Sequence, residues 1–310
     1  MLNVTSLRIA TRKSQLALWQ AEHVARGLRE AHAALGVELV PMSTKGDLIL
    51  DRSLAAIGGK GLFIKELETA LQSGDAEIAV HSMKDLPAEL PDGFVIGAVL
   101  PRADARDALV CPRAVRLEDL PPGARVGTSS LRRQAQLLAA RPDLRIEPLR
   151  GNLNTRLRRL DEGELDAIVL ACAGLVRLGW EARIAAHLST RISLPAVGQG
   201  VIGVECRSDD PKTRALLAAL EHAPTRIALT AERAFSQRLG GSCQSPVGAH
   251  ATLTADGLRL EGLVAAPDGT RVLRDAIDGA PHDAAALGVR LAERLLAAGA
   301  APLLERSHQA

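Results

Sequence analysis

From the start of the chain to about residue 205, two hydrophobic patterns alternate. Short apolar runs rich in β-branched residues predict strands, and amphipathic stretches between them predict helices. Regular alternation of this kind is typical of an α/β fold. The runs predicted as strands are 7–11, 37–42, 76–80, 94–100, 125–129, 165–171 and 201–206. The stretches predicted as helices are 14–32, 60–74 and 130–144.

The pattern changes after about residue 222. A helix is expected over 225–239, and a glycine-rich segment follows it. Three strand-like runs come next, joined by the turn signals ADG and PDG, and an apolar helical pattern over 283–299 closes the chain. This last part predicts a small α+β domain.

Two pairs of segments within the α/β part resemble each other. Residues 71–86 match 160–175 in the order of leucine, glycine, acidic and valine positions, and 8–16 match 125–133 in running from a strand through threonine into a helix with basic residues at its start. Two related lobes with a ligand in the cleft between them explain both matches. The alternative is chance similarity between helix–loop–strand units.

The predicted division has three parts, and the chain is expected to pass between the lobes near 100–107 and again near 193–200. The first lobe comprises residues 1–100 with 200–218, the second lobe 101–199, and the C-terminal α+β domain 219–310.

Composition narrows the choice of partners. The 310 residues are 47% hydrophobic and 24% charged, which is ordinary for a soluble globular protein. A net charge of +2 does not indicate a polyanionic partner by itself, and the absence of Tyr argues against binding of single-stranded nucleic acid by base stacking. No run reaches the roughly 18 apolar residues of a membrane span, and the first residues do not read as a signal peptide. We therefore expect a cytoplasmic protein that binds neither membranes nor nucleic acid.

One of the four cysteines differs from the others. Cys111, Cys172 and Cys206 lie in strand-like apolar runs, where a free cysteine behaves as a small hydrophobic residue. Cys243 instead lies in the glycine-rich loop LGGSCQSPVG. The cysteines form no CxxC pair and the eight His are scattered, so no metal site is predicted.

Basic residues recur at predicted helix starts, where the helix dipole favours acidic side chains. The helix starts follow strands or loops at the expected carboxyl edge of a sheet, which is the usual ligand side of an open α/β fold. Backbone N–H groups and guanidinium groups together predict a site for a ligand with several carboxylates or phosphates. The alternative, arginines on solvated helix faces, is preferred for Arg158 and Arg159. The residues assigned to the anion site are Arg12, Lys13, Lys60, Arg132, Arg133, Arg150 and Arg156.

A single carboxylate is expected at the same edge. The strand at 76–80 runs into HSMKDLP, in which Asp85 is the only acidic residue beside Lys84 and His81. Such a group could stabilise a developing cation or move protons in a substrate. A loop-capping or salt-bridging aspartate is the alternative.

Long segments, in order along essentially the whole chain, carry a family resemblance. They read RIATRKSQLALWQA, STKGD, GGKGLFIKELE, IAVHSMKDLP, VGTSSLRRQAQL, LRGNLNTRL, LPAVGQG and GGSCQSPVG. Together they resemble the porphobilinogen deaminase family. The resemblance implies an α/β fold of two lobes similar to those of periplasmic binding proteins, with a central cleft and a small C-terminal α+β domain.

The resemblance also implies a transferase of tetrapyrrole (haem) biosynthesis. Enzymes of this family join four porphobilinogen molecules head to tail and release ammonia at each step. Hydrolysis then releases the product, hydroxymethylbilane, from the enzyme. Its dipyrromethane cofactor is attached by a thioether to a loop cysteine, which matches Cys243. A monomer is the family expectation, and Ser242 stands where many members have glycine.

Site residues are carried over by motif. Asp85 matches the catalytic carboxylate, which stabilises the azafulvenium cation left when the substrate loses ammonia. The stretch 47–60 would be a lid over the site. Residues implied to contact the cofactor are Lys84, Ser130, Arg132, Arg133 and Gly151. Residues implied to contact the substrate are Arg12, Ser14, Lys60, Thr128, Arg150, Arg156 and Arg177.

Two other functions would use part of this pattern. A non-catalytic two-lobed protein that binds anions would explain the lobes and the arginines, but it predicts an export signal and leaves Cys243 without a role. A nucleic-acid-binding module would explain the basic stretch 132–159, but it predicts a larger basic excess or stacking aromatic residues.

Overall fold

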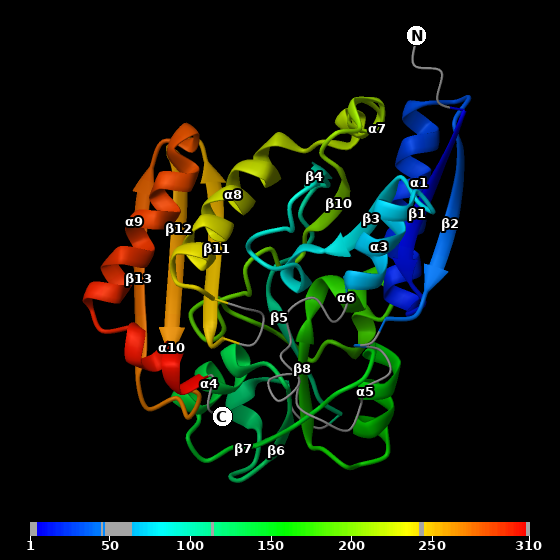
Figure 1. Ribbon diagram of the computed structural model, residues 1–310. Helices are drawn as coiled ribbons and strands as arrows, with labels where there is room; N and C mark the ends of the chain where they lie inside the picture. The colour runs from blue at the N-terminus through cyan, green and yellow to red at the C-terminus, as the bar shows by residue number, and fades with distance from the viewer. Residues whose placement is uncertain (1–4, 45, 47–63, 113–114, 242–244, 308–310) are drawn as a thin grey trace.

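Figure 1 shows the computed structural model of the chain, which describes residues 5–44, 46, 64–112, 115–241 and 245–307. The described residues form two α/β lobes, drawn at the upper right and at the bottom, and a third domain at the left. The two-lobe α/β fold with a small C-terminal α+β domain is therefore confirmed.

The first lobe is a five-stranded mixed sheet in the order β2-β1-β3-β10-β4. β1 is parallel to β2 and β3, whereas β10 is antiparallel to β3 and β4. Its strands are β1 (Ser6–Arg12), β2 (Gly36–Met42), β3 (Ile78–Ser82), β4 (Phe94–Val99) and β10 (Ile202–Arg207). Its helices are α1 (Gln15–Ala31), α3 (Lys65–Ser73) and α7 (Pro211–Leu217), with the 3-10 turns η2 (Met83–Asp85) and η5 (Ala218–Leu220).

The second lobe is a five-stranded mixed sheet in the order β7-β6-β8-β5-β9. β6 is parallel to β7 and β8, whereas β5 is antiparallel to β8 and β9. Its strands are β5 (Asp107–Val110), β6 (Arg125–Gly127), β7 (Arg145–Glu147), β8 (Ala167–Ala171) and β9 (Ala186–Leu188). Its helices are α4 (Leu131–Ala140), α5 (Leu153–Asp161) and α6 (Cys172–Arg177), with the 3-10 turns η3 (Leu117–Asp119) and η4 (Glu181–Arg183).

The two sheets have the same topology. In each, the second strand of the sheet order (β1 or β6) lies between two parallel neighbours, and an antiparallel strand (β10 or β5) pairs with the middle strand (β3 or β8). The similar segments occupy matching places, because 71–86 contain β3 and 160–175 contain β8. The repeat in the sequence thus reflects two related lobes.

The chain passes between the lobes twice. It leaves the first lobe after β4, and it returns in β10 after the whole second sheet is complete. The strands of the first sheet therefore come from 6–99 and 202–207, and those of the second from 107–188. The residue limits given above for the three domains stay a prediction.

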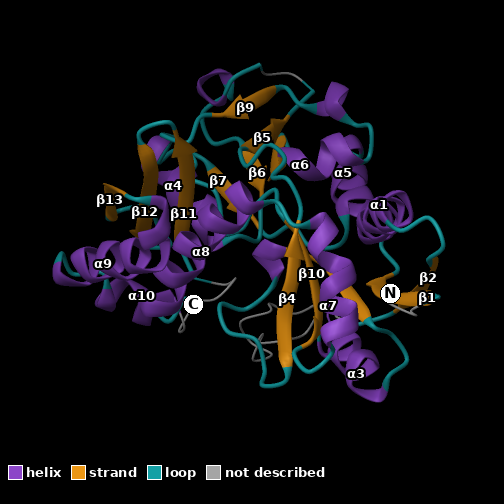
Figure 2. Cartoon of the chain, turned by 90° about the horizontal axis from the view of Figure 1, so that it is seen from above, coloured by secondary structure: helices purple, strands orange, loops and turns teal. Residues whose placement is uncertain are grey.

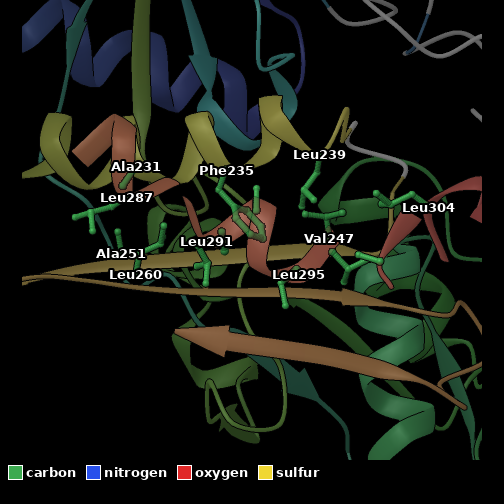
Figure 3. Close-up of a cluster of buried hydrophobic side chains, with 14 of the residues drawn as sticks. Ala231, Phe235, Leu239, Val247, Ala251, Leu260, Leu287, Leu291, Leu295 and Leu304 are labelled. Atoms are coloured by element: carbon green, nitrogen blue, oxygen red, sulfur yellow. The ribbon is translucent and has the colours of Figure 1, made fainter. Parts of the chain in front are cut away.

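The C-terminal domain is an antiparallel sheet, β11-β12-β13, covered on one face by helices. Phe235 is fully buried at the centre of its core among leucines from α9 and β12 (Figure 3). A Cβ at Gly262 would lie 2.6 Å from the Phe235 ring, so only glycine fits beneath it. The elements are β11 (Val247–Thr254), β12 (Gly257–Ala265), β13 (Val272–Gly279), α8 (Ala223–Arg238), α9 (Ala284–Ala297), α10 (Ala301–Ser307) and the turn η6 (Pro281–Asp283).

A buried ion pair joins this domain to both connections between the lobes. Arg102, in the connection after β4, donates to the two carboxylate oxygens of Glu232 in α8 at 2.6 and 2.8 Å. The same carboxylate accepts from the backbone N–H groups of Gly198, in the return connection, and Ala251, in β11, at 2.8 Å each. Glu232 is fully buried, so these four donors replace the water that its charge would otherwise hold.

We expect Glu232→Gln to lower the free energy of unfolding by about 3 kcal/mol, because it leaves the half-buried Arg102 without its counter-charge. Chemical denaturation measures the loss. Glu293→Gln is the control, since Glu293 pairs with Arg238 at 3.3 Å on the surface and its removal should cost less than about 1 kcal/mol. Equal losses in the two variants would contradict a joining role for Glu232.

Candidate active site

A cavity of about 590 Å³ lies where the two lobes meet the C-terminal domain. Most of its lining follows the carboxyl ends of β1, β3, β6, β7 and β8, as expected for a ligand site in an open α/β fold. The return connection contributes 196–197 and 199–201, and the C-terminal domain contributes Arg233, Ser236, Gly241, Ser245 and Val247.

The charge of the described lining is strongly one-sided. Asp85 is its only acidic residue. Its cationic residues are Arg12, Lys13, Lys84, Arg132, Arg133, Arg150, Arg156, Arg177 and Arg233. An anion with several carboxylates suits such a cavity, because each carboxylate relieves repulsion between neighbouring cations.

Lys84 and Asp85 lie together in η2, directly after β3. The Asp85 side chain is exposed, whereas Lys84 is half-buried. Burial lowers the pKa of Lys84 to about 8; Asp85 opposes this shift, and the nearby charge of Arg133 adds to it. A bound carboxylate would favour the charged form of this ammonium group.

Arg132 and Arg133 lie in the first turn of α4 and are both bound to Asp107 of β5. Arg132 donates to Asp107 at 2.8 Å and to the Leu194 carbonyl at 2.6 Å, and Arg133 donates to Asp107 at 2.7 and 3.0 Å. Burial alone would raise the pKa of Asp107, but the two guanidinium charges outweigh it and hold that pKa far below its usual value. Asp107 thus fixes both guanidinium groups in the wall of the cavity. Ser130 caps the helix by accepting from the Arg133 N–H at 3.5 Å.

The loop after β7 presents Arg150, Gly151 and Arg156. Gly151 has φ +100°, and a Cβ there would lie 2.8 Å from the Thr155 side chain, so the loop requires glycine. Arg156 donates from Nε to the Gly151 carbonyl at 2.8 Å. Burial, followed by the charge of Arg133, lowers the pKa of Arg156 to about 10. Asn152 caps α5 by accepting from the Thr155 N–H.

Contacts between the lobes join the start of α1 in the first lobe to α5 and α6 of the second, and Figure 2 shows these helices grouped on one side of the molecule. Arg177 lies over the ring of Trp19, 5.9 Å from its centroid, and donates to the Gly200 carbonyl at 2.8 Å. Burial lowers the pKa of Arg177 to about 10. Asn154 donates to the Gln15 side chain at 3.0 Å.

All the described residues assigned to the site from the sequence line this one cavity. They are Arg12, Lys13, Ser14, Lys84, Asp85, Thr128, Ser130, Arg132, Arg133, Arg150, Gly151, Arg156 and Arg177. Lys60, Ser242 and Cys243 lie outside the described residues, and so does the whole stretch 47–60. Gly241 and Ser245, on either side of 242–244, line the cavity, so the chain on both sides of Cys243 leads into it.

Two family models match the chain. One, described as porphobilinogen deaminase, dipyromethane cofactor binding domain, matches residues 7–215, and the other, described as porphobilinogen deaminase, C-terminal domain, matches 226–297. The chain belongs to the porphobilinogen deaminase family. It is an enzyme of tetrapyrrole biosynthesis that forms hydroxymethylbilane from porphobilinogen with a dipyrromethane cofactor, and the resemblance drawn from the sequence motifs is confirmed.

Solved structures with a similar fold include three bacterial proteins. The VFT2 domain of BvgS from Bordetella pertussis is 14% identical, with a TM-score of 0.43 over 70% of this chain and 86% of that one. A putative methionine-binding lipoprotein from Bacillus subtilis is 13% identical, with a TM-score of 0.46 over 70% and 91%. A periplasmic substrate-binding protein of an ABC transporter from Coxiella burnetii is 16% identical, with a TM-score of 0.44 over 73% and 96%.

The sequence did not reveal several residues that shape the deaminase cavity. Asp107 lies in a short apolar run, and only the fold shows that Arg132, Arg133, Ser193 and Gln199 all bind its carboxylate. Arg233 reaches the lining from α8, which the sequence gave no reason to place beside the cleft. For Asn152, the signal was present, because GNLNT is a helix start with an N-cap residue.

One group of three potential metal ligands occurs among the described residues: Asp104, Cys172 and His187. Both Asp104 oxygens accept from Arg106 at 2.6 to 3.0 Å, and burial raises the pKa of the Cys172 thiol to about 12. A metal ion would have to displace Arg106 and deprotonate the thiol.

Among the described helices, none has the length and hydropathy that crossing a membrane requires.

The lowered pKa of Lys84 gives a test of the cavity's electrostatics. The Cys243→Ser protein would lack the cofactor, and the pKa of Lys84 is expected to be about 8 there. In the cofactor-bearing protein the pKa of Lys84 is expected to be higher, because carboxylates stabilise the ammonium group. Cofactor binding should therefore take up protons near that pH. The rate of acetylation as a function of pH, followed peptide by peptide by mass spectrometry, measures both values.

Exposed Lys212 is the reference within the same protein. If the acetylation rates of Lys84 and Lys212 change with pH in the same way in the cofactor-free protein, Lys84 is not desolvated as described. If cofactor attachment leaves the pKa of Lys84 unchanged, no carboxylate of the cofactor lies beside it.

Proposed function

We propose that this cavity holds the dipyrromethane cofactor on Cys243 and the pyrrole chain that grows from it, with Asp85 as the catalytic carboxylate. The observation that carries the proposal is the position of Asp85, which is the only acidic side chain in a described lining that contains nine arginines and lysines. A cationic reaction intermediate would find its counter-charge at this one place.

The residues present fit the cofactor. Each pyrrole ring of the cofactor carries an acetate and a propionate, so two rings bring four carboxylates into a cavity rich in cations. A volume of about 590 Å³ lies within the usual range for small-molecule sites. Gly241 and Ser245 in the lining allow the thiol between them to serve as the anchor.

We assign the carboxylates of the cofactor to the residues named from the motifs, with Lys84, Ser130 and Gly151 beside Arg132 and Arg133. Asp107 supports this assignment, because it holds both guanidinium groups in place before any ligand binds. Arg132 Nε is buried and has no hydrogen-bond partner among the described residues, so it can still donate. The substrate's acetate and propionate are assigned to Arg12, Ser14, Lys60, Thr128, Arg150, Arg156 and Arg177.

When bound, the cofactor supplies a nucleophilic pyrrole carbon to which the first substrate is joined. Asp85 acts on the substrate: as the aminomethyl C–N bond breaks and ammonia leaves, its carboxylate stabilises the cation that remains. After the new C–C bond forms, Asp85 can accept the proton that the attacking pyrrole carbon gives up. Lys84 and Arg156 both lie close enough to Asp85 for its charge to act on them.

We also propose that the enzyme acts as a monomer in the cytoplasm. The described cysteines, Cys111, Cys172 and Cys206, are free thiols, as in a reducing compartment.

Asp85→Asn keeps the size and the hydrogen-bonding reach of the side chain but removes its charge. We expect kcat to fall about 100-fold or more, while folding and the attached cofactor are retained. Release of hydroxymethylbilane under saturating porphobilinogen measures the loss. Asp209→Asn changes an exposed aspartate outside the cavity and should leave turnover unchanged. Near-normal turnover by Asp85→Asn would refute its role.

The anchor is tested by the mass of the intact, denatured protein. The natural chain should carry an excess mass of two linked pyrrole units, and Cys243→Ser should not. If the natural chain has no excess mass, it is incubated with porphobilinogen and weighed again. An unchanged mass after that incubation, or an equal excess on Cys243→Ser, would contradict Cys243 as the anchor.

A further inference from the structure

A buried pair of ionisable side chains lies directly before the turn that carries Asp85. His81 is the penultimate residue of β3, and its Nε2 lies 2.8 Å from Oε2 of Glu205 in β10. The side chain of His81 is 5% exposed and that of Glu205 is completely buried. Neither residue lines the cavity, so neither is placed to touch the substrate.

The register of the two strands sets this pair. His81 lies opposite Gly203, and Glu205 lies opposite Ala79, in the antiparallel ladder between β3 and β10. Residues two apart on a strand share a face, so His81 and Glu205 are diagonal neighbours on the same face of the sheet. Glu68 of α3 lies near them, because burial and then the charge of Glu205 raise its pKa, while His81 lowers it.

A gain in stability does not by itself explain this pair. A buried ion pair often stabilises a fold no better than apolar side chains of the same volume, because removing both charges from water is costly. Within the described part of the chain, no hydrogen bond reaches the Glu205 carboxylate or His81 Nε2, so the approach of these two groups to 2.8 Å is the contact on which a role for the pair rests. A role in fixing the orientation of nearby residues explains why two such groups meet here.

The turn after His81 is firmly held, so a constraint on His81 reaches Asp85. Gln20 of α1 donates to the Ser82 hydroxyl at 2.8 Å, and the Met83 N–H donates to the Val201 carbonyl at 3.0 Å. Met83 packs so closely over Gly203 that a Cβ there would collide with its sulfur. Contacts with Gln20, Val201 and Gly203 thus hold the residues between His81 and Asp85 in place.

We propose that His81 and Glu205 are positioning residues for the known reaction, which hold the end of β3 so that Asp85 points at the reacting carbon of the substrate. The inference rests on the catalytic role proposed for Asp85. A small displacement of a catalytic group costs turnover more than binding. Loss of the pair should therefore lower kcat and leave KM nearly unchanged.

The test compares three variants of the cofactor-bearing enzyme, with kcat, KM for porphobilinogen, melting temperature and intact mass measured for each. Glu205→Gln and His81→Leu are expected to lower kcat about tenfold or more, with KM within about twofold of the natural enzyme. His81→Gln places an amide N–H near the position of Nε2, so it should recover much of the loss. Cys206→Ala removes a buried thiol from the next position of β10 and should lower only the melting temperature.

Several results would overturn the proposal. They are an unchanged kcat in Glu205→Gln, a rise in KM alone, or an equal loss in His81→Gln and His81→Leu, since each indicates a structural or binding role. If His81→Leu does not fold, Glu205→Gln and His81→Gln decide by the same criteria. Asp85→Asn is measured alongside: an active Asp85→Asn refutes the proposed role of Asp85, whereas an inactive one with normal Glu205→Gln refutes only the positioning role.

Discussion

The carboxylate of Glu232 is the point at which the three domains depend on one another. It binds Arg102 and Gly198, one in each connection between the lobes, while lying in α8 and contacting β11. Both connections are thereby tied to the domain whose glycine-rich loop carries Cys243. If Cys243 anchors the growing chain and Asp85 acts on it, as proposed above, the domain that carries the anchor must be fixed relative to both lobes, because any freedom there would add to the movement of the chain.

Concentrated positive charge is the second constraint on the structure. Burial lowers the pKa values of Lys84, Arg156 and Arg177, so the cavity holds its cations at a cost in desolvation. Asp107 offsets part of this cost for Arg132 and Arg133. The remainder is offset when carboxylates enter. The cationic residues repel one another in the absence of ligand, and they therefore favour binding of a polyanion. Each added ring brings two further carboxylates.

The periodicity of the sequence predicts much of the fold, because long amphipathic helices and apolar central strands leave a strong pattern. It does not predict β7 or β9, which are three residues each and lie at the edges of the second sheet. Such short edge strands form through pairing with neighbours rather than through their own pattern. The described cavity residues that the motifs name were predictable, whereas Arg233 and the acids Asp107, Glu205 and Glu232 were not. Each of these acids acts through a partner distant in sequence, which only the fold brings within reach.

Comparison of the two lobes shows why only the first of them supplies an acidic residue to the described cavity lining. In the match of 71–86 to 160–175, Lys84 corresponds to Ala173 and Asp85 corresponds to Gly174. All four residues line the cavity. A Cβ at Gly174 would lie 3.1 Å from Leu153 and 3.6 Å from Leu16, so this position of the second lobe is occupied by packing against α1 of the first. The second lobe has no acid at this position and supplies arginines from neighbouring helix starts. A second carboxylate there would compete with the substrate for those arginines, so a single acid is what a polyanionic substrate with a cationic intermediate requires.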